Sequence, residues 1–402
     1  MSDNRHSSRL HHTHQYSGTR IRRIRWQKLP QNVANARGSM PEKFATASCD
    51  EAGFGTNKVA IWHLVSEEVN WDETNARSDG REELMEDDVY SLTKIPEVDW
   101  KFVQSACIEL KADVNELQFL NEDHIIYGTS AGQLVLAKWS RGERSLSPVH
   151  VFDGIHTANE GCTAFSLLGN DIVSLGSCGT LTRIDLNSMT VLSKQTEKAV
   201  GNGGYNGVIS SSKFGPLLCI EHFSATEIVT GNAAGQLQIW DLRQRPEPRT
   251  QLASTTASSG AVTAIRAHPS QRHILAAGHQ SGHLSFWDLR GTSQKMTSFA
   301  ADIHNGPIWE LQFHPIYQSH LYSACNDGMV LDWDASNVKL IGDNLSVSPW
   351  TLSTDQLRDQ IKLTNLIPDN TMAASTLDVA GDTILVGTDD DSIWMVKNLN
   401  VS

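Results

Sequence analysis

Residues 261–290 read AVTAIRAHPSQRHILAAGHQSGHLSFWDLR and contain one full copy of a pattern that recurs along the chain. This stretch contains three short segments rich in apolar side chains, and the two that flank the turn glycine are predicted to be short β-strands. The first segment ends at Pro269, because proline has no N–H to donate to a strand ladder. The second and third segments flank Gly282, and glycine readily adopts the positive φ of a tight turn. The stretch therefore predicts three strands joined by tight turns.

The turn glycine recurs along the chain at intervals of 47, 56, 47 and 46 residues. In each copy an aliphatic residue follows the glycine by two positions, and another precedes it by seven positions. The five turn glycines are Gly132, Gly179, Gly235, Gly282 and Gly328. Repeats of about this length each predict one blade of a β-propeller.

Two further units lie at the ends of the chain. Residues 21–30 (IRRIRWQKLP) repeat the first segment loosely and mark the first unit, and a degenerate last unit occupies residues 375–398. Propeller blades bury their faces against their neighbours and close into one body, so the length of the chain does not require several domains. The sequence therefore predicts an all-β fold, a seven-bladed β-propeller, over residues 20–402.

The last unit ends soon after its third strand, so its fourth strand has to come from elsewhere. Residues 11–17, which precede the first unit, are available for this role. A strand from the N-terminus would cover the open edge of the last sheet and latch the ring. We therefore expect part of the basic, histidine-rich segment 1–19 to close the propeller, with a disordered tail as the alternative.

Tryptophan followed by aspartate ends the third segment of three units, as in the WD-repeat (WD40) propellers. These dipeptides are Trp240-Asp241, Trp287-Asp288 and Trp333-Asp334. In the sixth unit four residues resemble the hydrogen-bonded tetrad of WD repeats: His304, Ser323, Asp327 and Trp333. Such a buried network would tie the loop before the first strand to the third strand, so these residues are expected to be structural. The second and third units lack the tryptophan and would close by packing alone.

Two insertions interrupt the repeat. The first, at about residues 66–99, carries twelve acidic residues against Arg77, Arg81 and Lys94. A segment of this composition cannot bury enough apolar area to offset its ordering entropy, so the sequence predicts a disordered acidic loop. The second insertion spans roughly residues 337–372 and contains DQLRDQIKL (355–363), for which a short helix is expected.

The composition excludes several classes of protein. A net charge of -13 argues against direct nucleic-acid binding, because phosphate affinity needs clustered Lys and Arg. The six cysteines form no C-x-x-C pair, so we predict no zinc site, no other metal site and no cofactor. No apolar run approaches the roughly 20 residues of a membrane span, and the N-terminus lacks an apolar secretory core. We expect a soluble intracellular protein without membrane insertion.

Two motifs resemble catalytic ones. Residues 128–132 (GTSAG) match the G-x-S-x-G elbow of hydrolases, but that mechanism needs a helix after the serine, and here another strand follows. Residues 201–207 (GNGGYNG) resemble a phosphate-binding loop, but no Lys-Ser/Thr pair follows them. No segment combines a nucleophile, a base and an orienting group. The sequence therefore predicts a non-catalytic protein.

Segments along nearly the whole chain, from about residue 20 to 398, resemble a WD-repeat nucleoporin family. The resemblance rests on IRWQKLP, FATAS, GQLQIWDLRQ, HPSQRHILAAGHQSGHLSFWDLR, ACNDGMVLDWDAS and STLDV. It implies a monomeric propeller that acts as a structural scaffold in the Y-shaped outer-ring subcomplex of the nuclear pore. It also implies an α-solenoid nucleoporin of the short arm as the partner, a part in mRNA and protein transport, and, in animal cells, a presence at mitotic kinetochores. The acidic insertion departs from the family in length and charge.

W-D-x-R motifs favour a second interpretation. Residues 240–243 and 287–290 resemble motifs of substrate receptors for cullin-4 ubiquitin ligases, in which the arginine reaches the adaptor from the propeller rim. Arg243 and Arg290 are therefore candidate rim contacts, unless each of them simply pairs with acidic residues at the edge of its blade. The scaffold nucleoporin is the preferred function, and the ligase receptor is the alternative.

Overall fold

A computed structural model describes most of the chain. The described residues are 10–28, 40–49, 56–68, 98–195, 216–243, 250–253, 260–290, 295–299, 304–338, 348–351, 360–368, 370–399 and 401. Within these ranges the regular structure is nearly all β-strand, as expected, and no helix there is long and apolar enough to cross a bilayer.

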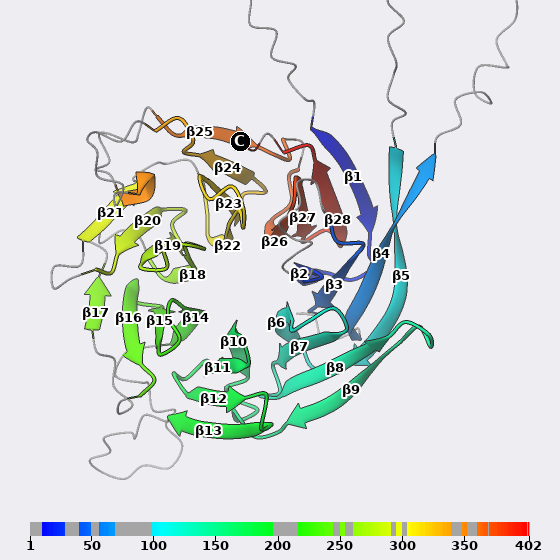
Figure 1. The fold of residues 1–402 in the computed structure, drawn as a ribbon, viewed down its shortest axis with the longest axis horizontal. Helices are drawn as coiled ribbons and strands as arrows, with labels where there is room; N and C mark the ends of the chain where they lie inside the picture. The colour runs from blue at the N-terminus through cyan, green and yellow to red at the C-terminus, as the bar shows by residue number, and fades with distance from the viewer. Residues whose placement is uncertain are drawn as a thin grey trace, which may run out of the picture.

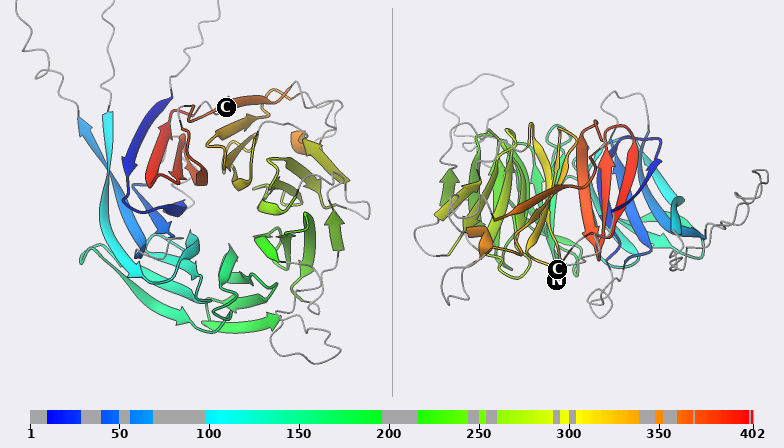
Figure 2. Two further views of the ribbon diagram at one scale, coloured as in Figure 1. Left: turned by 180° about the vertical axis from the view of Figure 1, so that it is seen from behind. Right: turned by 90° about the horizontal axis from the view of Figure 1, so that it is seen from above.

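The strands form seven four-stranded antiparallel sheets around a central axis, which confirms the predicted seven-bladed propeller (Figures 1 and 2). The first blade consists of β2 (Ile21–Trp26), β3 (Lys43–Ser48), β4 (Asn57–Glu68) and β5 (Val98–Leu110), and the second of β6 (Val114–Phe119), β7 (His124–Thr129), β8 (Leu134–Ser140) and β9 (Ser145–Phe152). The third blade consists of β10 (Cys162–Leu168), β11 (Asp171–Gly176), β12 (Leu181–Asp185) and β13 (Thr190–Gln195), and the fourth of β14 (Leu217–His222), β15 (Glu227–Asn232), β16 (Gln236–Asp241) and β17 (Thr250–Ala253). The fifth blade consists of β18 (Val262–Ala267), β19 (Ile274–His279), β20 (Leu284–Asp288) and β21 (Lys295–Phe299). The sixth consists of β22 (Ile308–Phe313), β23 (His320–Cys325), β24 (Val330–Asp334) and β25 (Lys362–Asn365). The seventh consists of β26 (Ala374–Ala380), β27 (Thr383–Thr388), β28 (Ser392–Lys397) and β1 (His11–Tyr16).

The hydrophobic core lies between the blades. Each cluster of buried side chains draws on two neighbouring sheets, as where Ile61 of the first blade packs with Leu117 and Trp139 of the second. Burial at about 25 cal/mol per Å² of apolar surface is the main stabilising term, and a blade obtains it only from its neighbours. The ring therefore depends on every blade being present and on the first and last blades meeting.

The turn glycines adopt the predicted conformation. Gly132 and Gly235 have φ values of +82° and +79°, which side chains other than glycine rarely adopt. A Cβ on Gly132 would also lie 2.5 Å from the carbonyl oxygen of His156 in the loop that leads to the next blade. The glycine thus serves both the turn and the close approach of the next loop.

The N-terminal strand closes the ring, as predicted. β1 pairs antiparallel with β28, in register from His11 opposite Lys397 to Tyr16 opposite Ser392. The side-chain amide of Gln15 reaches the first blade, donating to the carbonyl of Phe102 at 2.9 Å and accepting from its N–H at 3.0 Å. β1 therefore completes the seventh sheet and also bonds to the edge of the first.

Both insertions differ from their predictions where the structure describes them. β4 and β5 pair out to Glu68 opposite Val98, so the two ends of the predicted loop at 66–99 are strand, and residues 69–97 lie outside the described residues. The helix predicted over 355–363 is wrong at its C-terminal end, because Lys362 and Leu363 belong to β25. The open edge of β24 needs a pairing strand, and this long-range pairing outweighs local helical periodicity. Residues 352–359 lie outside the described part of the chain.

We predict that removing residues 1–17 lowers the free energy of unfolding by about 3 kcal/mol or more, because six paired residues are lost at roughly 0.5–1.5 kcal/mol per hydrogen bond. The measurement is urea unfolding followed by tryptophan fluorescence. Tyr16→Ala is the control within the strand, since its side chain is 68% exposed and should change stability by less than about 0.5 kcal/mol. An unfolding midpoint unchanged by the truncation would contradict the latch.

Candidate interaction site

The sixth blade brings the four tetrad residues together. The His304 ring lies 3.2 Å from Asp327 through Nδ1 and 2.8 Å from the Ser323 hydroxyl through Nε2, and the Trp333 indole N–H donates to the same hydroxyl at 2.8 Å. Burial acts to raise the pKa of Asp327, but hydrogen bonds from His304 and from backbone N–H groups outweigh it and set the pKa at about 2. These bonds tie the loop before β22 to β23 and β24, a structural arrangement.

Partial versions of this network occur in other blades. Trp240 donates to Thr230 at 2.8 Å, and Trp287 donates to Ser285 at 3.1 Å. The third blade has a buried His156–Ser174 hydrogen bond of 2.7 Å, so the expectation that this blade closes by packing alone is wrong. The bond needs a histidine before the first strand and a serine on the second, and it does not need the tryptophan on which the sequence argument relied.

A possible metal site overlaps the tetrad. One ligand atom from each of His304, Cys325 and Asp327 lies within 4.8 Å of the others. His304 and Asp327 already bond to each other, and burial raises the pKa of Cys325 to about 12, which disfavours the thiolate that a metal requires. The cluster is therefore better suited to its structural role than to metal binding.

The two W-D-x-R arginines each bind the aspartate of their own motif. Arg243 donates to Asp241 from Nε at 2.9 Å and from Nη2 at 2.8 Å, and Arg290 bonds to Asp288 with the same geometry at 3.0 and 2.7 Å. Their side chains remain 64% and 45% exposed. Asp334, the aspartate of the third dipeptide, instead accepts from the Ser336 N–H. Both guanidinium groups lie at the surface, and each is held by two hydrogen bonds, a fork, to the aspartate of its own motif.

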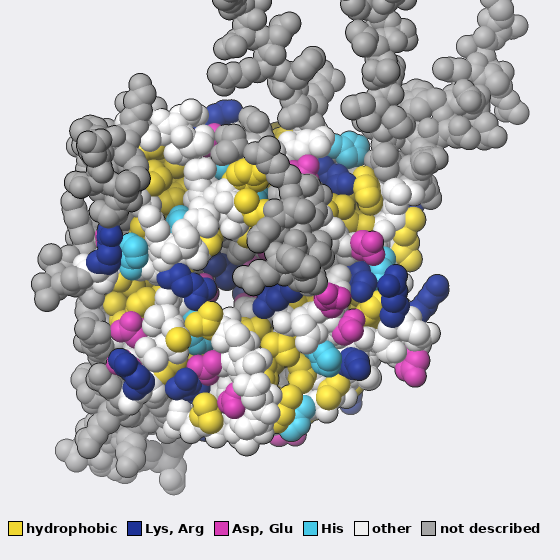
Figure 3. Space-filling model, in the orientation of Figure 1, with side chains coloured by type: hydrophobic (Ala, Val, Ile, Leu, Met, Phe, Trp, Pro, Cys, Tyr) yellow, Lys and Arg dark blue, Asp and Glu magenta, His cyan; other side chains and the backbone are white. Residues whose placement is uncertain are grey.

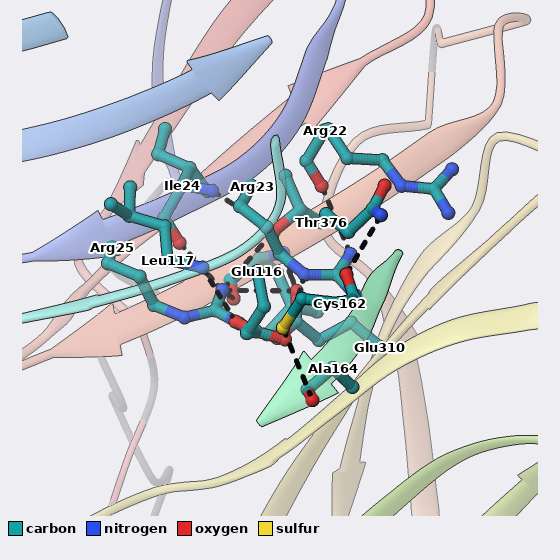
Figure 4. Close-up of polar contacts among 12 residues, drawn as sticks. Arg22, Arg23, Ile24, Arg25, Glu116, Leu117, Cys162, Ala164, Glu310 and Thr376 are labelled. Atoms are coloured by element: carbon teal, nitrogen blue, oxygen red, sulfur yellow. Dashed lines mark hydrogen bonds and ion pairs between the residues drawn. The ribbon is translucent and has the colours of Figure 1, made fainter. Parts of the chain in front are cut away.

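A network of buried ion pairs crosses the centre of the ring, and the repeat pattern of the sequence did not predict it (Figure 4). Arg25 of β2 lies 2.6 Å from Glu310 of β22 and 3.0 Å from Glu116 of β6. Arg23 also bonds to Glu116, at 3.1 Å, and Arg266 of β18 extends the network from Glu310 at 3.3 Å. The network therefore links the innermost strands of four blades.

Electrostatics within this network favours charged side chains in the buried centre. Burial alone would lower the pKa of Arg25, but Glu310 and Glu116 raise it above its ordinary value. Burial alone would raise the pKa of Glu310, but Arg25, Arg23 and Arg266 hold it at about 2. Asp378 of β26 forms no such close ion pair with any described residue, and its burial, only partly offset by Arg25, raises its pKa to about 6. A carboxyl group with this pKa is half-protonated at about pH 6.

A cavity of about 460 Å³ opens where the innermost strands end, lined among others by Arg25, Gln118, Arg266, Gln312 and Asp378. Lys and Arg side chains lie near the centre of the face shown in Figure 3. The signal for this site was present in the sequence. Equivalent positions of the first strands read R-I-R, E-L-Q, A-I-R, E-L-Q and T-L-D, so charges replace apolar residues at positions that face the channel.

Comparison with known proteins finds similarity along nearly the whole chain. The chain is 27% identical to nucleoporin Nup43 of Mus musculus over 413 residues, which cover 94% of this chain and 97% of that protein. Its identity to nucleoporin Nup43 of Homo sapiens is 26%, with the same coverage. No family model matches the chain. Together with the seven-bladed ring, this end-to-end similarity supports a WD-repeat nucleoporin.

In this propeller, the polar residues of the tetrad and of the channel bond mainly to one another. We predict that Glu310→Gln lowers the free energy of unfolding by about 3 kcal/mol, because the buried Arg25 then keeps only Glu116 as a carboxylate partner and Arg266 also loses its ion pair with Glu310. Urea unfolding at pH 7 measures the effect. Gln312→Ala, two residues further along β22 and lining the cavity, is the control. A loss equal to that of the control would show that the ion pairs contribute little.

The raised pKa of Asp378 predicts a pH dependence of stability. The folded protein binds a proton at Asp378 up to about pH 6, whereas the unfolded chain releases it near pH 3.8, so this residue makes stability fall as pH rises between these values. Asp378→Asn removes the titration. We therefore expect the stability of the variant relative to wild type to increase from pH 4 to pH 6, measured by urea unfolding at a series of pH values. A difference that is constant with pH would contradict the raised pKa.

Proposed function

We propose that this chain is a non-catalytic structural subunit of the nuclear pore, within the Y-shaped outer-ring subcomplex. In that position it binds an α-solenoid nucleoporin and supports the transport of mRNA and protein. The observation that carries the proposal is the similarity to nucleoporin Nup43 over 94% of this chain and 97% of that protein. A match along the whole propeller involves every blade, whereas one shared WD motif would indicate only the fold.

The structural bonds made by the buried polar residues support a scaffold function. His304, Asp327 and Ser323 hold one blade together, and Arg25 with Glu310 holds several blades together. Groups that are saturated by structural bonds are poor candidates for proton transfer or nucleophilic attack, because catalysis needs a group placed within reach of a substrate. Propellers offer wide rims and walls for binding, and protein partners therefore fit this molecule better than a small substrate.

The ligase-receptor alternative depends on Arg243 and Arg290. Each guanidinium already forms a two-bond fork with its own aspartate, so an adaptor would have to compete with that fork. The exposure of both arginines nevertheless leaves the alternative open to a direct test.

The test uses a fluorescently tagged full-length chain in the cells that express it, with purification followed by mass spectrometry. We expect staining of the nuclear rim and co-purification of solenoid nucleoporins, for wild type and for Arg243→Ala combined with Arg290→Ala. Arg183→Ala is the matched control, since Arg183 forms the same kind of fork with Asp171 outside a WD motif. Imaging through mitosis tests the kinetochore localisation.

Two results would reverse the choice between the functions. One is a wild-type purification dominated by a cullin adaptor, with no solenoid nucleoporin. The other is loss of that adaptor in the double variant but not in Arg183→Ala, while circular dichroism shows that all three proteins are folded.

A further inference from the structure

The outer strands of the first three blades differ from those of the next three. β5, β9 and β13 contain 13, 8 and 6 residues, whereas β17, β21 and β25 contain 4, 5 and 4. The three longer strands follow one another around the outer wall of the ring (Figure 1). We call this sector, β5, β9 and β13 with the third strands that pair with them, the outer wall of blades one to three.

Each outer strand of this sector carries a β-bulge. In the second blade Leu136 pairs with His150 and Ala137 pairs with Pro148, so Val149 is the extra residue. In the third blade Leu192 is extra in the same way, between Ser193 and Val191. The described pairings of the outer strands of blades four to six contain no such shift. Bulges interrupt the hydrogen-bonding edge, so this wall is a poor template for an added β-strand.

The same wall exposes apolar side chains. Of the eleven large apolar residues that are exposed in the described part of the chain, seven lie on or beside these strands: Val65, Val103, Val149, Val151, Met189, Val191 and Leu192. The two bulge residues, Val149 and Leu192, are among the most exposed, at 54% and 53%. Apolar groups in water contribute nothing to folding, and their clustering on one wall marks an interaction surface.

The charges on the wall indicate the chemistry of the partner. Among the described exposed side chains of β4, β5, β8, β9, β12 and β13, the charged ones are Lys101, Lys138 and Lys194 with a single acid, Glu109. The chain as a whole carries a net charge of -13, so the exposed lysines make this wall basic by comparison. A partner with acidic residues beside an apolar stripe would match both features.

We propose that the outer wall of blades one to three binds an amphipathic α-helix whose apolar stripe is flanked by acidic residues. The bulges disfavour a strand, and a helix presents apolar side chains at positions i, i+3, i+4 and i+7, which can contact the exposed valines and leucine of this wall. The inference deepens the proposed function, because it names the surface for a helical pore protein and rests on that function for the identity of the partner.

Photo-crosslinking tests the surface directly. A photoreactive amino acid replaces Val149 in the full-length chain in cells, and in a matched control it replaces Leu363, an exposed apolar residue of the outer strand of blade six. We expect position 149 to crosslink to a helical segment of a nucleoporin with 3–4-residue apolar spacing and acidic flanks. Crosslinks to a second copy of this chain, crosslinks to its own residues 69–97, or yields no higher than at position 363 would each overturn the proposal.

Substitutions then measure the contribution of the wall. Val149→Asp combined with Leu192→Asp should reduce recovery of the crosslinked nucleoporin at least tenfold, and Lys138→Glu combined with Lys194→Glu should reduce it in the same direction. Leu363→Asp should leave recovery unchanged. Circular dichroism and the melting temperature should match wild type, because all of these side chains are exposed. Undiminished recovery in both double variants would overturn the proposal.

The outcomes separate this inference from the proposed function. If the wild-type chain is absent from the nuclear rim and recovers no nucleoporin, the pore function fails. If rim staining and nucleoporin recovery persist while position 149 gives no crosslink above the control, the function stands and this surface is rejected.

Discussion

The pairing of β1 with β28 is the constraint on which the rest of the structure depends. Each blade buries apolar surface only against the blades beside it, so an open ring would leave two sheet faces and one sheet edge in water. β1 supplies the missing fourth strand of the last sheet, and Gln15 joins that strand to the backbone of Phe102 in the first blade. One strand therefore converts a row of sheets into a closed body.

Inside the closed ring, charges take the place that apolar side chains have elsewhere in the core. Taking Arg25 and Glu310 out of water costs free energy, which a single pair often fails to recover. Here Arg25 meets two carboxylates, and Glu310 also accepts from Thr376 and from the N–H of Leu377 in the seventh blade. The bonds run between blades, so they fix how the sheets are placed around the channel.

The outside of the ring is less regular than its inside. The first strands follow one template in every blade, whereas the fourth strands range from 4 to 13 residues. This difference follows from packing. The innermost strand of a blade contacts the innermost strands of the two adjacent blades, whereas the outer strand faces solvent. A scaffold protein can therefore vary its outer wall without losing the ring, and the bulged, apolar and basic wall of blades one to three is the largest such variation among the described residues.

The sequence by itself determined the features that depend on local geometry. Alternation and turn glycines predicted seven blades, the unit that lacked a strand predicted the latch by residues 11–17, and WD spacing predicted the contacts of His304. Only the tertiary structure decided which distant residues meet. Arg25 pairs with Glu310, and the strand Lys362–Asn365 pairs with β24. The repeat pattern does not indicate that these segments meet. Turn geometry and side-chain alternation are set by neighbouring residues, whereas ion pairs, edge pairing and bulges are set by how the closed ring brings separate blades together.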